Sequence, residues 1–291
     1  MKLGYSSMTA GIYDLDEAFR LACDLSLDFV ELTYDVCDFL PDAQPVCKVK
    51  ELVRATGVTV SVHLPFIDLN IASLISEARR AAVEQTRRGL EYAAAVNAEC
   101  GVLHTGTVFV YQPRPLSDAQ DALLTSLDEL PKVGVPLALE NLGLYVDGLI
   151  REPQMLLELT QQAGGCKNGV YNCLDFGHAH IEASRPWRTA PASDPVQGYI
   201  DTLGESIVHL HLCNNNGSDD LHTATSEGTL RYEAYRDYLS NFEGTVCLEV
   251  AGGRGSVQKS AQHIRSLVQQ TVLSADQGRD KSLYRSATDA H

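Results

Sequence analysis

The sequence lacks an uninterrupted apolar run of 18 residues, paired CxxC cysteines and any excess of basic residues. Its N-terminal stretch, MKLGYSSMTAG, also lacks the apolar core of a signal peptide. We therefore expect neither membrane insertion nor secretion. The eight cysteines are scattered, and several lie in apolar runs where cysteine acts as a small buried hydrophobe. A reduced, cytoplasmic protein is expected.

Positive charge is the second shortage. The chain has 38 acidic and 23 basic residues, which gives a formal charge of -15. That balance opposes sequence-independent attraction to phosphate backbones. No Gly-x-Gly-x-x-Gly motif follows the first apolar run, so a dinucleotide-binding sheet is disfavoured as well. The charge balance therefore disfavours a duplex nucleic acid as the partner.

Short β-rich apolar runs alternate with longer amphipathic stretches, which is typical of a parallel sheet with crossover helices. At 291 residues with 44% hydrophobic content, eight such pairs favour an α/β fold with a single (β/α)8 TIM barrel over an open sheet. We predict a barrel domain over 1–274 and a polar C-terminal tail over 275–291. The expected strands are 3–6, 28–33, 59–64, 101–105, 136–141, 170–176, 207–213 and 245–250. The expected helices are 15–25, 46–56, 75–96, 117–130, 153–162, 194–203, 232–241 and 257–273.

Ionisable side chains stand at the ends of six consecutive expected strands. In residues 207–227, His209 and His211 share one face of a strand, and Asp220 and His222 follow in a polar loop. The carboxyl ends of barrel strands converge on one mouth, where such enzymes place their chemistry. The nine candidates at this mouth are His63, His104, Glu140, Asp175, His178, His211, Asp220, His222 and Glu249.

These nine side chains combine imidazoles with carboxylates. A carboxylate on an apolar strand is costly to bury without a partner, and a divalent metal removes that cost. Imidazole and carboxylate ligands suit zinc, manganese or iron, and the absence of a thiolate cluster disfavours a structural zinc site. We predict one to three divalent ions, zinc or manganese, as the cofactor.

Around these residues, the motifs are HLPFIDLNIAS, VLHTG, ALENLG, LDFGHAH, HLHLCNNNGSDDLH, EGT and LEV. With them the sequence resembles the xylose isomerase-like TIM-barrel superfamily, over residues 3–273. This superfamily includes sugar and sugar-phosphate isomerases and epimerases, together with the endonuclease IV branch of AP endonucleases (AP endonuclease family 2). The resemblance therefore implies a metal-dependent enzyme and leaves two reactions open.

The two branches imply different uses of the same residues. Resemblance to endonuclease IV implies three metals, held by the sets His63, His104, Glu140; Glu140, Asp175, His211, Glu249; and His178, Asp220, His222. Resemblance to the ketose epimerases implies one metal, bound by the second of these sets alone. In that branch Glu140 and Glu249 would also act as the acid/base pair, and His178 would contact the substrate.

The loop after the second expected strand reads TYDVCDFLPDAQP, with acids and neither Arg nor Lys, which disfavours a duplex partner. We therefore favour isomerisation or epimerisation of a sugar or sugar phosphate, with proton transfer through an enediolate. Phosphodiester hydrolysis, as in an AP endonuclease, is the alternative, and a binding protein without turnover is the third class. Apolar helix faces leave the oligomeric state open. Candidate substrate contacts are Phe66, Arg185, Trp187 and Arg254.

Overall fold

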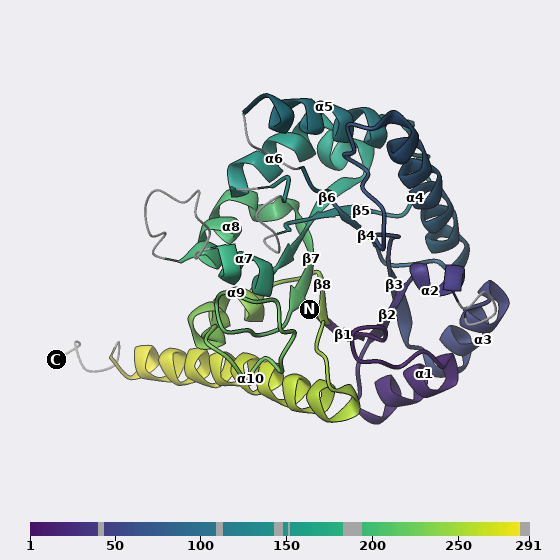
Figure 1. Cartoon of the computed structure of the whole chain (residues 1–291). Coiled ribbons are helices and arrows are strands. Elements are labelled where there is room, and N and C mark those ends of the chain that lie inside the picture. Colours follow the sequence, from purple (N-terminus) through teal and green to yellow (C-terminus); the bar gives the residue numbers. More distant parts are fainter. Residues whose placement is uncertain (40–43, 109–112, 143–147, 151, 183–193, 286–291) are drawn as a thin grey trace.

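Eight parallel strands close into one barrel in the order β1 to β8, with β1 paired to β8 (Figure 1). The structure is a computed structural model that describes residues 1–39, 44–108, 113–142, 148–150, 152–182 and 194–285; at 113, 114 and 270–285 it describes the backbone alone. The single (β/α)8 barrel expected from the alternating pattern is confirmed. The strands are β1 Lys2–Ser6, β2 Phe29–Thr33, β3 Thr59–His63, β4 Gly101–His104, β5 Leu137–Glu140, β6 Val170–Asp175, β7 Ile207–Leu212 and β8 Thr245–Leu248.

Helices surround the barrel on the outside (Figure 1). Most agree with the amphipathic stretches of the sequence to within a few residues, while two short helices at strand ends, α2 and α7, lack enough turns to give a periodic signal. The helices are α1 Leu15–Asp24, α2 Asp35–Phe39, α3 Val46–Thr56, α4 Ser76–Val96, α5 Pro113–Glu129, α6 Pro153–Gln162, α7 Phe176–Glu182, α8 Pro195–Leu203, α9 Arg236–Asn241 and α10 Gly253–Arg285. Three 3-10 turns, η1 Gly165–Asn168, η2 Gly204–Ser206 and η3 Tyr232–Tyr235, complete the connections.

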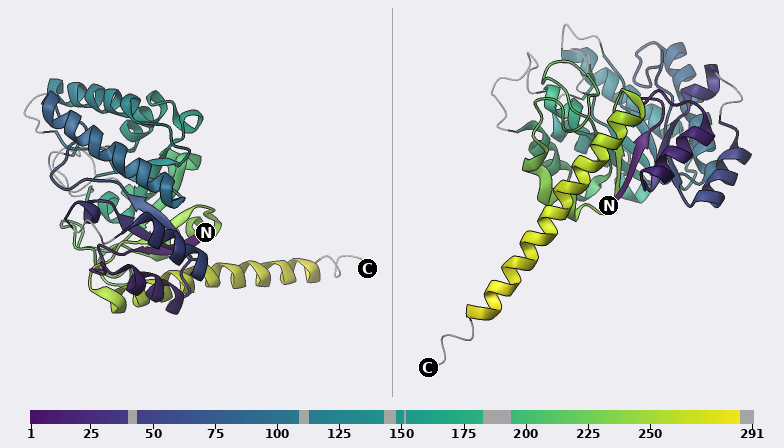
Figure 2. Two further views of the ribbon diagram at one scale, coloured as in Figure 1. Left: turned by 90° about the vertical axis from the view of Figure 1, so that its right-hand side faces the viewer. Right: turned by 90° about the horizontal axis from the view of Figure 1, so that it is seen from below.

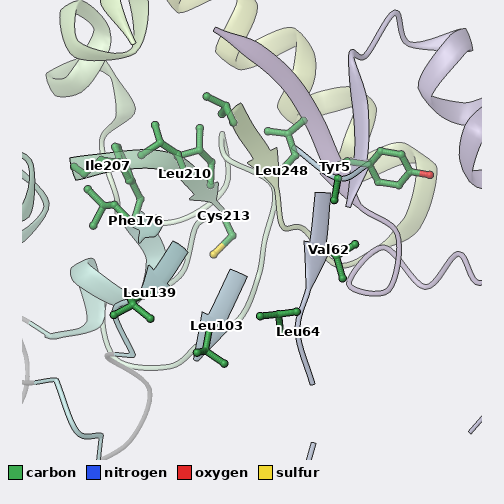
Figure 3. Packing of buried hydrophobic residues seen from close by; sticks show 14 of the residues in the cluster. Tyr5, Val62, Leu64, Leu103, Leu139, Phe176, Ile207, Leu210, Cys213 and Leu248 are labelled. Atoms are coloured by element: carbon green, nitrogen blue, oxygen red, sulfur yellow. The ribbon is translucent and has the colours of Figure 1, made fainter. Parts of the chain in front are cut away.

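Alternation along each strand sorts side chains between two environments. Leu103, Leu139 and Leu210 belong to one apolar cluster with Leu123 of α5 and Leu156 of α6, so they fill the layer between strands and helices (Figure 3). Their sequence neighbours on the strands point the other way, into the barrel. The period of two therefore places every second residue of a strand end in the barrel interior, where the candidate site forms.

Helix α10 continues to Arg285 and so includes the first part of the stretch that the sequence analysis assigns to a C-terminal tail. Its second half extends away from the barrel (Figure 2). Within the described ranges no helix combines the length and apolar character needed to cross a membrane.

Candidate metal centre

Glu140, the last residue of β5, lies at the centre of the site and is 1% exposed. Its Oε2 atom lies 3.5 Å from Nε2 of His63, at the end of β3, and 3.3 Å from Nε2 of His104, at the end of β4. Potential ligand atoms of these three residues all lie within 4.8 Å of one another. This spacing is suitable for one metal ion shared by two imidazoles and a carboxylate.

A second group contains Glu140 again, with Asp175, His211 and Glu249, and its ligand atoms also lie within 4.8 Å of one another. Nδ1 of His211 is 3.2 Å from Oε1 of Glu140 and 3.3 Å from Oε2 of Glu249. Asp175 Oδ2 lies 3.9 Å from the same nitrogen. Three carboxylates thus surround one imidazole nitrogen, and this set of ligand atoms could hold a divalent cation.

His178, Asp220 and His222 form a third group within the same 4.8 Å limit. Asp220 Oδ2 lies 2.8 Å from Nε2 of His222 and 3.8 Å from Nε2 of His178. The structure therefore brings together all nine residues that the sequence analysis singled out. Whether each of them binds a metal stays a prediction.

Three of the histidines are oriented by backbone carbonyls. Nδ1 of His63 lies 3.0 Å from Leu64 O, Nδ1 of His178 lies 2.9 Å from Asn141 O, and Nδ1 of His222 lies 2.8 Å from Glu249 O. A carbonyl oxygen can only accept, so each Nδ1 carries a proton and Nε2 is the nitrogen that can bind a metal. This is the usual arrangement behind a metal-binding imidazole.

The residues fit a metal because buried polar atoms point into the groups without another use. Among the described residues, Glu140 Oε2, Asp175 Oδ2, His178 Nε2 and Asp220 Oδ1 are buried and make no hydrogen bond. Unsatisfied buried polar atoms are rare because each costs about 1–3 kcal/mol. Divalent cations among these atoms would remove that cost, and the mixture of imidazole and carboxylate suits zinc or manganese.

The ionisable side chains of the three ligand groups shift one another's pKa values. Burial raises the pKa of Asp175 to about 7, where His178 opposes the rise and the carboxylates of Glu140 and Glu249 add to it. Burial also works to raise the pKa of Glu249, but His211 and His222 outweigh it and hold the value at about 2. Burial would lower the pKa of His211, yet the acidic groups around it raise that pKa well above its ordinary value. In the metal-free protein, protons on imidazoles therefore balance the carboxylates.

A metal must displace those protons, which gives a prediction about pH. Because the pKa values of His211 and His222 are raised in the metal-free protein, both rings are protonated near neutral pH and must lose protons to bind a cation. We expect zinc affinity to weaken as the pH falls, about tenfold per pH unit for each proton displaced. Calorimetric titrations at several pH values measure this slope, and an affinity that does not change with pH would contradict it.

The loop that carries Asp220 and His222 is held by Asn214. Its amide donates to Thr225 O at 2.9 Å and Leu230 O at 3.0 Å, while its Oδ1 accepts from Leu230 N at 3.0 Å. Gly228, in the EGT motif, passes so close that a Cβ there would lie 2.3 Å from this Oδ1. An asparagine suits this position because it donates and accepts, which an ionised aspartate cannot do.

The structure describes two of the four candidate substrate contacts, Phe66 and Arg254. The half-buried ring of Phe66 lies beside His63 and His104, with ring centroids 4.9 and 4.6 Å apart, so it forms part of the wall of the centre. Arg254 is 57% exposed and pairs with Asp24 at 2.9 Å, which leaves its guanidinium less free to hold a phosphate. Arg185 and Trp187 lie outside the described residues.

Glu31 of β2 is the residue that the sequence analysis missed. It is fully buried inside the barrel, and its carboxylate lies 3.1 Å from Nε2 of His211 and 3.2 Å from Nε2 of His209. Burial works to raise the pKa of Glu31, but the two imidazoles outweigh it and keep the value well below its ordinary range. A glutamate within the apolar run DFVELT was the available signal, because a buried acid needs a partner.

The chain is similar in sequence to several known proteins. It is 26% identical to an uncharacterized protein of Methanocaldococcus jannaschii over 266 residues, which cover 89% of this chain and 86% of the relative. It is 22% identical to fructoselysine 3-epimerase of Escherichia coli O157:H7 over 262 residues, which cover 86% of this chain and 90% of that enzyme.

Solved structures give the same fold. A D-tagatose 3-epimerase-like protein superposes with a TM-score of 0.78 at 24% identity, covering 94% of this chain and 100% of that chain. A protein of Thermus thermophilus, from a crystal soaked with zinc chloride, superposes with a TM-score of 0.69 at 23% identity, covering 93% and 99%. The family model described as xylose isomerase-like TIM barrel matches residues 19–267, which is most of the sequence. The chain therefore belongs to the xylose isomerase-like TIM barrel family.

Proposed function

We propose that the protein is a metal-dependent epimerase or isomerase of a small sugar. The observation that carries the proposal is the position of Glu140, the last residue of β5, and Glu249, the residue after β8, which approach the same His211 nitrogen at 3.2 and 3.3 Å. Two carboxylates that flank one metal position can reach a bound sugar carbon from opposite sides. That arrangement is what inversion at a carbon next to a carbonyl requires.

The proposed reaction needs two groups that transfer protons, and Glu140 and Glu249 would supply them. One glutamate removes the proton next to the carbonyl, and the other returns a proton to the opposite face of the carbon. A bound divalent cation, zinc or manganese, would supply Lewis-acid stabilisation of the negative charge that develops on the substrate oxygens. His178, with its Nε2 directed toward Asp220, would contact a sugar hydroxyl, and Phe66 would cover an apolar face of the ring.

Relatives named as sugar epimerases support a small-molecule sugar as the partner. The formal charge of -15 agrees with a neutral or modestly charged substrate better than with a polyanion. A phosphorylated sugar would need a cationic handle, and Arg254 is engaged by Asp24.

Proton exchange tests the proposal directly. Protein purified without chelator is analysed for metal content, then incubated with a panel of ketoses and aldoses, with and without phosphate groups, in deuterium oxide. We expect one or more sugars to epimerise or isomerise with incorporation of deuterium at the reacting carbon, and chelation to stop the reaction. Metal-loaded protein that neither exchanges nor converts any sugar in the panel would contradict the proposal.

A second candidate, a phosphodiesterase with up to three metals, is favoured by the group of His178, Asp220 and His222, which a single-metal epimerase does not need. Replacing Asp220 with Ala separates the two. The side chain lies 2.8 Å from His222 Nε2 and outside the Glu140 and Glu249 group. We expect Asp220→Ala to keep sugar epimerisation within about tenfold of the unmodified protein, since its carboxylate takes no part in the proton transfer.

The same variant would lose most activity on an abasic-site phosphodiester if the hydrolase alternative were correct, because one metal position would lack its carboxylate. Both assays are run side by side on one preparation, with metal content measured for each protein. Hydrolysis of abasic DNA by the unmodified protein and its loss in Asp220→Ala would overturn the epimerase proposal.

A further inference from the structure

Glu31 is a buried carboxylate to which the proposed reaction assigns no role. Its Oε2 accepts a hydrogen bond from Ser61 Oγ at 3.0 Å and lies 3.2 Å from His209 Nε2. Its Oε1 lies 3.1 Å from His211 Nε2 and 3.6 Å from the Cys247 thiol. Potential donors thus approach both carboxylate oxygens, and an ionised carboxylate at the centre of the barrel is compatible with them.

His211 differs from its neighbours in how its ring is held. His63, His178 and His222 place Nδ1 on a backbone carbonyl and direct Nε2 into the centre. His211 does the reverse, since its Nδ1 faces Glu140 and Glu249 while its Nε2 faces Glu31. A side-chain carboxylate therefore occupies the place that a carbonyl has behind the other rings.

A second histidine, His209, contacts the same carboxylate of Glu31. His209 lies on the far side of the same carboxylate, and its Nδ1 is 2.6 Å from Thr245 Oγ1. Both His211 and Glu31 are 0% exposed, so water does not compete for these contacts. The two Nε2 atoms are at hydrogen-bond distance from the carboxylate, although neither is aligned well enough to count as a hydrogen bond.

We infer that Glu31 is a positioning residue for the metal ligand His211. It fixes the tautomer with the proton on Nε2, so that the Nδ1 lone pair faces the position between Glu140, Asp175 and Glu249. The inference rests on the proposed function, because it assumes that this group binds a divalent cation. A second metal among Glu31, His209, His211 and Cys247 is disfavoured, because His211 would have to give up the proton that faces Glu31.

Replacing Glu31 with Gln tests the inference through metal affinity. The amide is neutral, so the Nε2–H of His211 loses its charged acceptor, and the amide can also turn its own N–H toward that nitrogen. We expect zinc or cobalt to bind about 10- to 100-fold more weakly, as is usual when the partner behind a metal-binding histidine is removed. The cobalt absorption spectrum should also change, because the ring of His211 turns.

Ser61→Ala is the matched control. It removes one hydrogen bond to Oε2 of Glu31 and leaves the contact with His211 at Oε1. If Glu31 acted only as a buried charge that stabilises the barrel, both variants would lower the melting temperature and neither would change metal affinity. A folded Glu31→Gln protein that binds metal within threefold of the unmodified protein would overturn the inference.

A measurement on the unmodified protein decides the matter if Glu31→Gln does not fold. With nitrogen-15 histidine and cadmium-113, the His211 ring, identified by its absence in His211→Gln, should couple to cadmium through Nδ1 and carry a proton on Nε2. Coupling through Nε2 would overturn the inference. Unmodified protein that binds no metal would overturn both this inference and the proposed function. Tight metal binding without sugar conversion would contradict the proposed function alone, and the metal affinity of Glu31→Gln would still test the inference.

Discussion

Glu140→Gln should abolish both metal binding and turnover, with a loss of activity of more than about 10³-fold. The side chain is placed within reach of four imidazoles, since its oxygens lie 3.5 Å from His63, 3.3 Å from His104, 3.3 Å from His178 and 3.2 Å from His211. It belongs to two of the ligand groups and is also one of the two proposed proton-transfer carboxylates. No other side chain combines these positions among the residues that the structure describes.

The barrel should survive this change. Glutamine has nearly the same volume as glutamate, so the packing around residue 140 is kept. Burial works to raise the pKa of Glu140, but the surrounding imidazoles outweigh it and hold that pKa well below its ordinary value, so the charged carboxylate stabilises the metal-free fold. We expect the metal-free Glu140→Gln protein to fold with a lower melting temperature than the unmodified protein, measured by circular dichroism.

Glu99→Gln is the matched control for Glu140→Gln. Glu99 pairs with Lys2 at 2.6 Å, beside the amino ends of the strands and away from the metal groups. The same chemical change there should leave metal content and turnover unaltered, because an exposed ion pair contributes little. If Glu140→Gln kept more than about a tenth of normal turnover, neither the epimerase nor the hydrolase assignment would stand.

The barrel and the cluster of nine side chains could be predicted because both follow from simple periods. Strand ends such as VLHTG and ALENLG carry an ionisable residue at the last inward position, and barrel closure brings those positions together. Glu31 does not fit this pattern, because it lies two residues before the end of β2 and not at the end of the strand. His209 lies three residues before the end of β7, and its contact with Glu31 of β2 joins strands that are far apart in the sequence.

Other features depend on contacts between residues far apart in the sequence. Arg254 follows β8 as a phosphate-binding arginine would, but its partner Asp24 is 230 residues away. The polar stretch after residue 274 is compatible with tail or helix by composition, and here α10 continues to Arg285. Pairings and continuations of this kind need three-dimensional information, because no local pattern distinguishes them.

Glu249→Gln should separate chemistry from metal binding. Glu249 accepts from Thr9 Oγ1 at 3.3 Å and lies 3.3 Å from His211, and it is 12% exposed, more than Glu140. The amide oxygen of glutamine can take the place of Oε2 and bind a cation, and its N–H can donate to Thr9 Oγ1, but an amide cannot take a proton from carbon. We expect kcat to fall by about 10²- to 10⁴-fold while KM and metal content change little.

Deuterium exchange makes this prediction specific to a two-base epimerase. If Glu140 and Glu249 act on opposite faces, the Glu249→Gln protein should still exchange the reacting proton of one epimer through Glu140, without inverting it. The other epimer should show neither exchange nor inversion. Thr9→Val removes the hydrogen bond to Glu249 and the one between Thr9 Oγ1 and Ser6 Oγ. It should still invert both epimers, slowed by about 10- to 100-fold, because a hydrogen bond to a charged group is worth about 1.5–3 kcal/mol. Equal residual inversion of both epimers by Glu249→Gln would instead indicate a single base, and Glu249 would then be a metal ligand without a role in proton transfer.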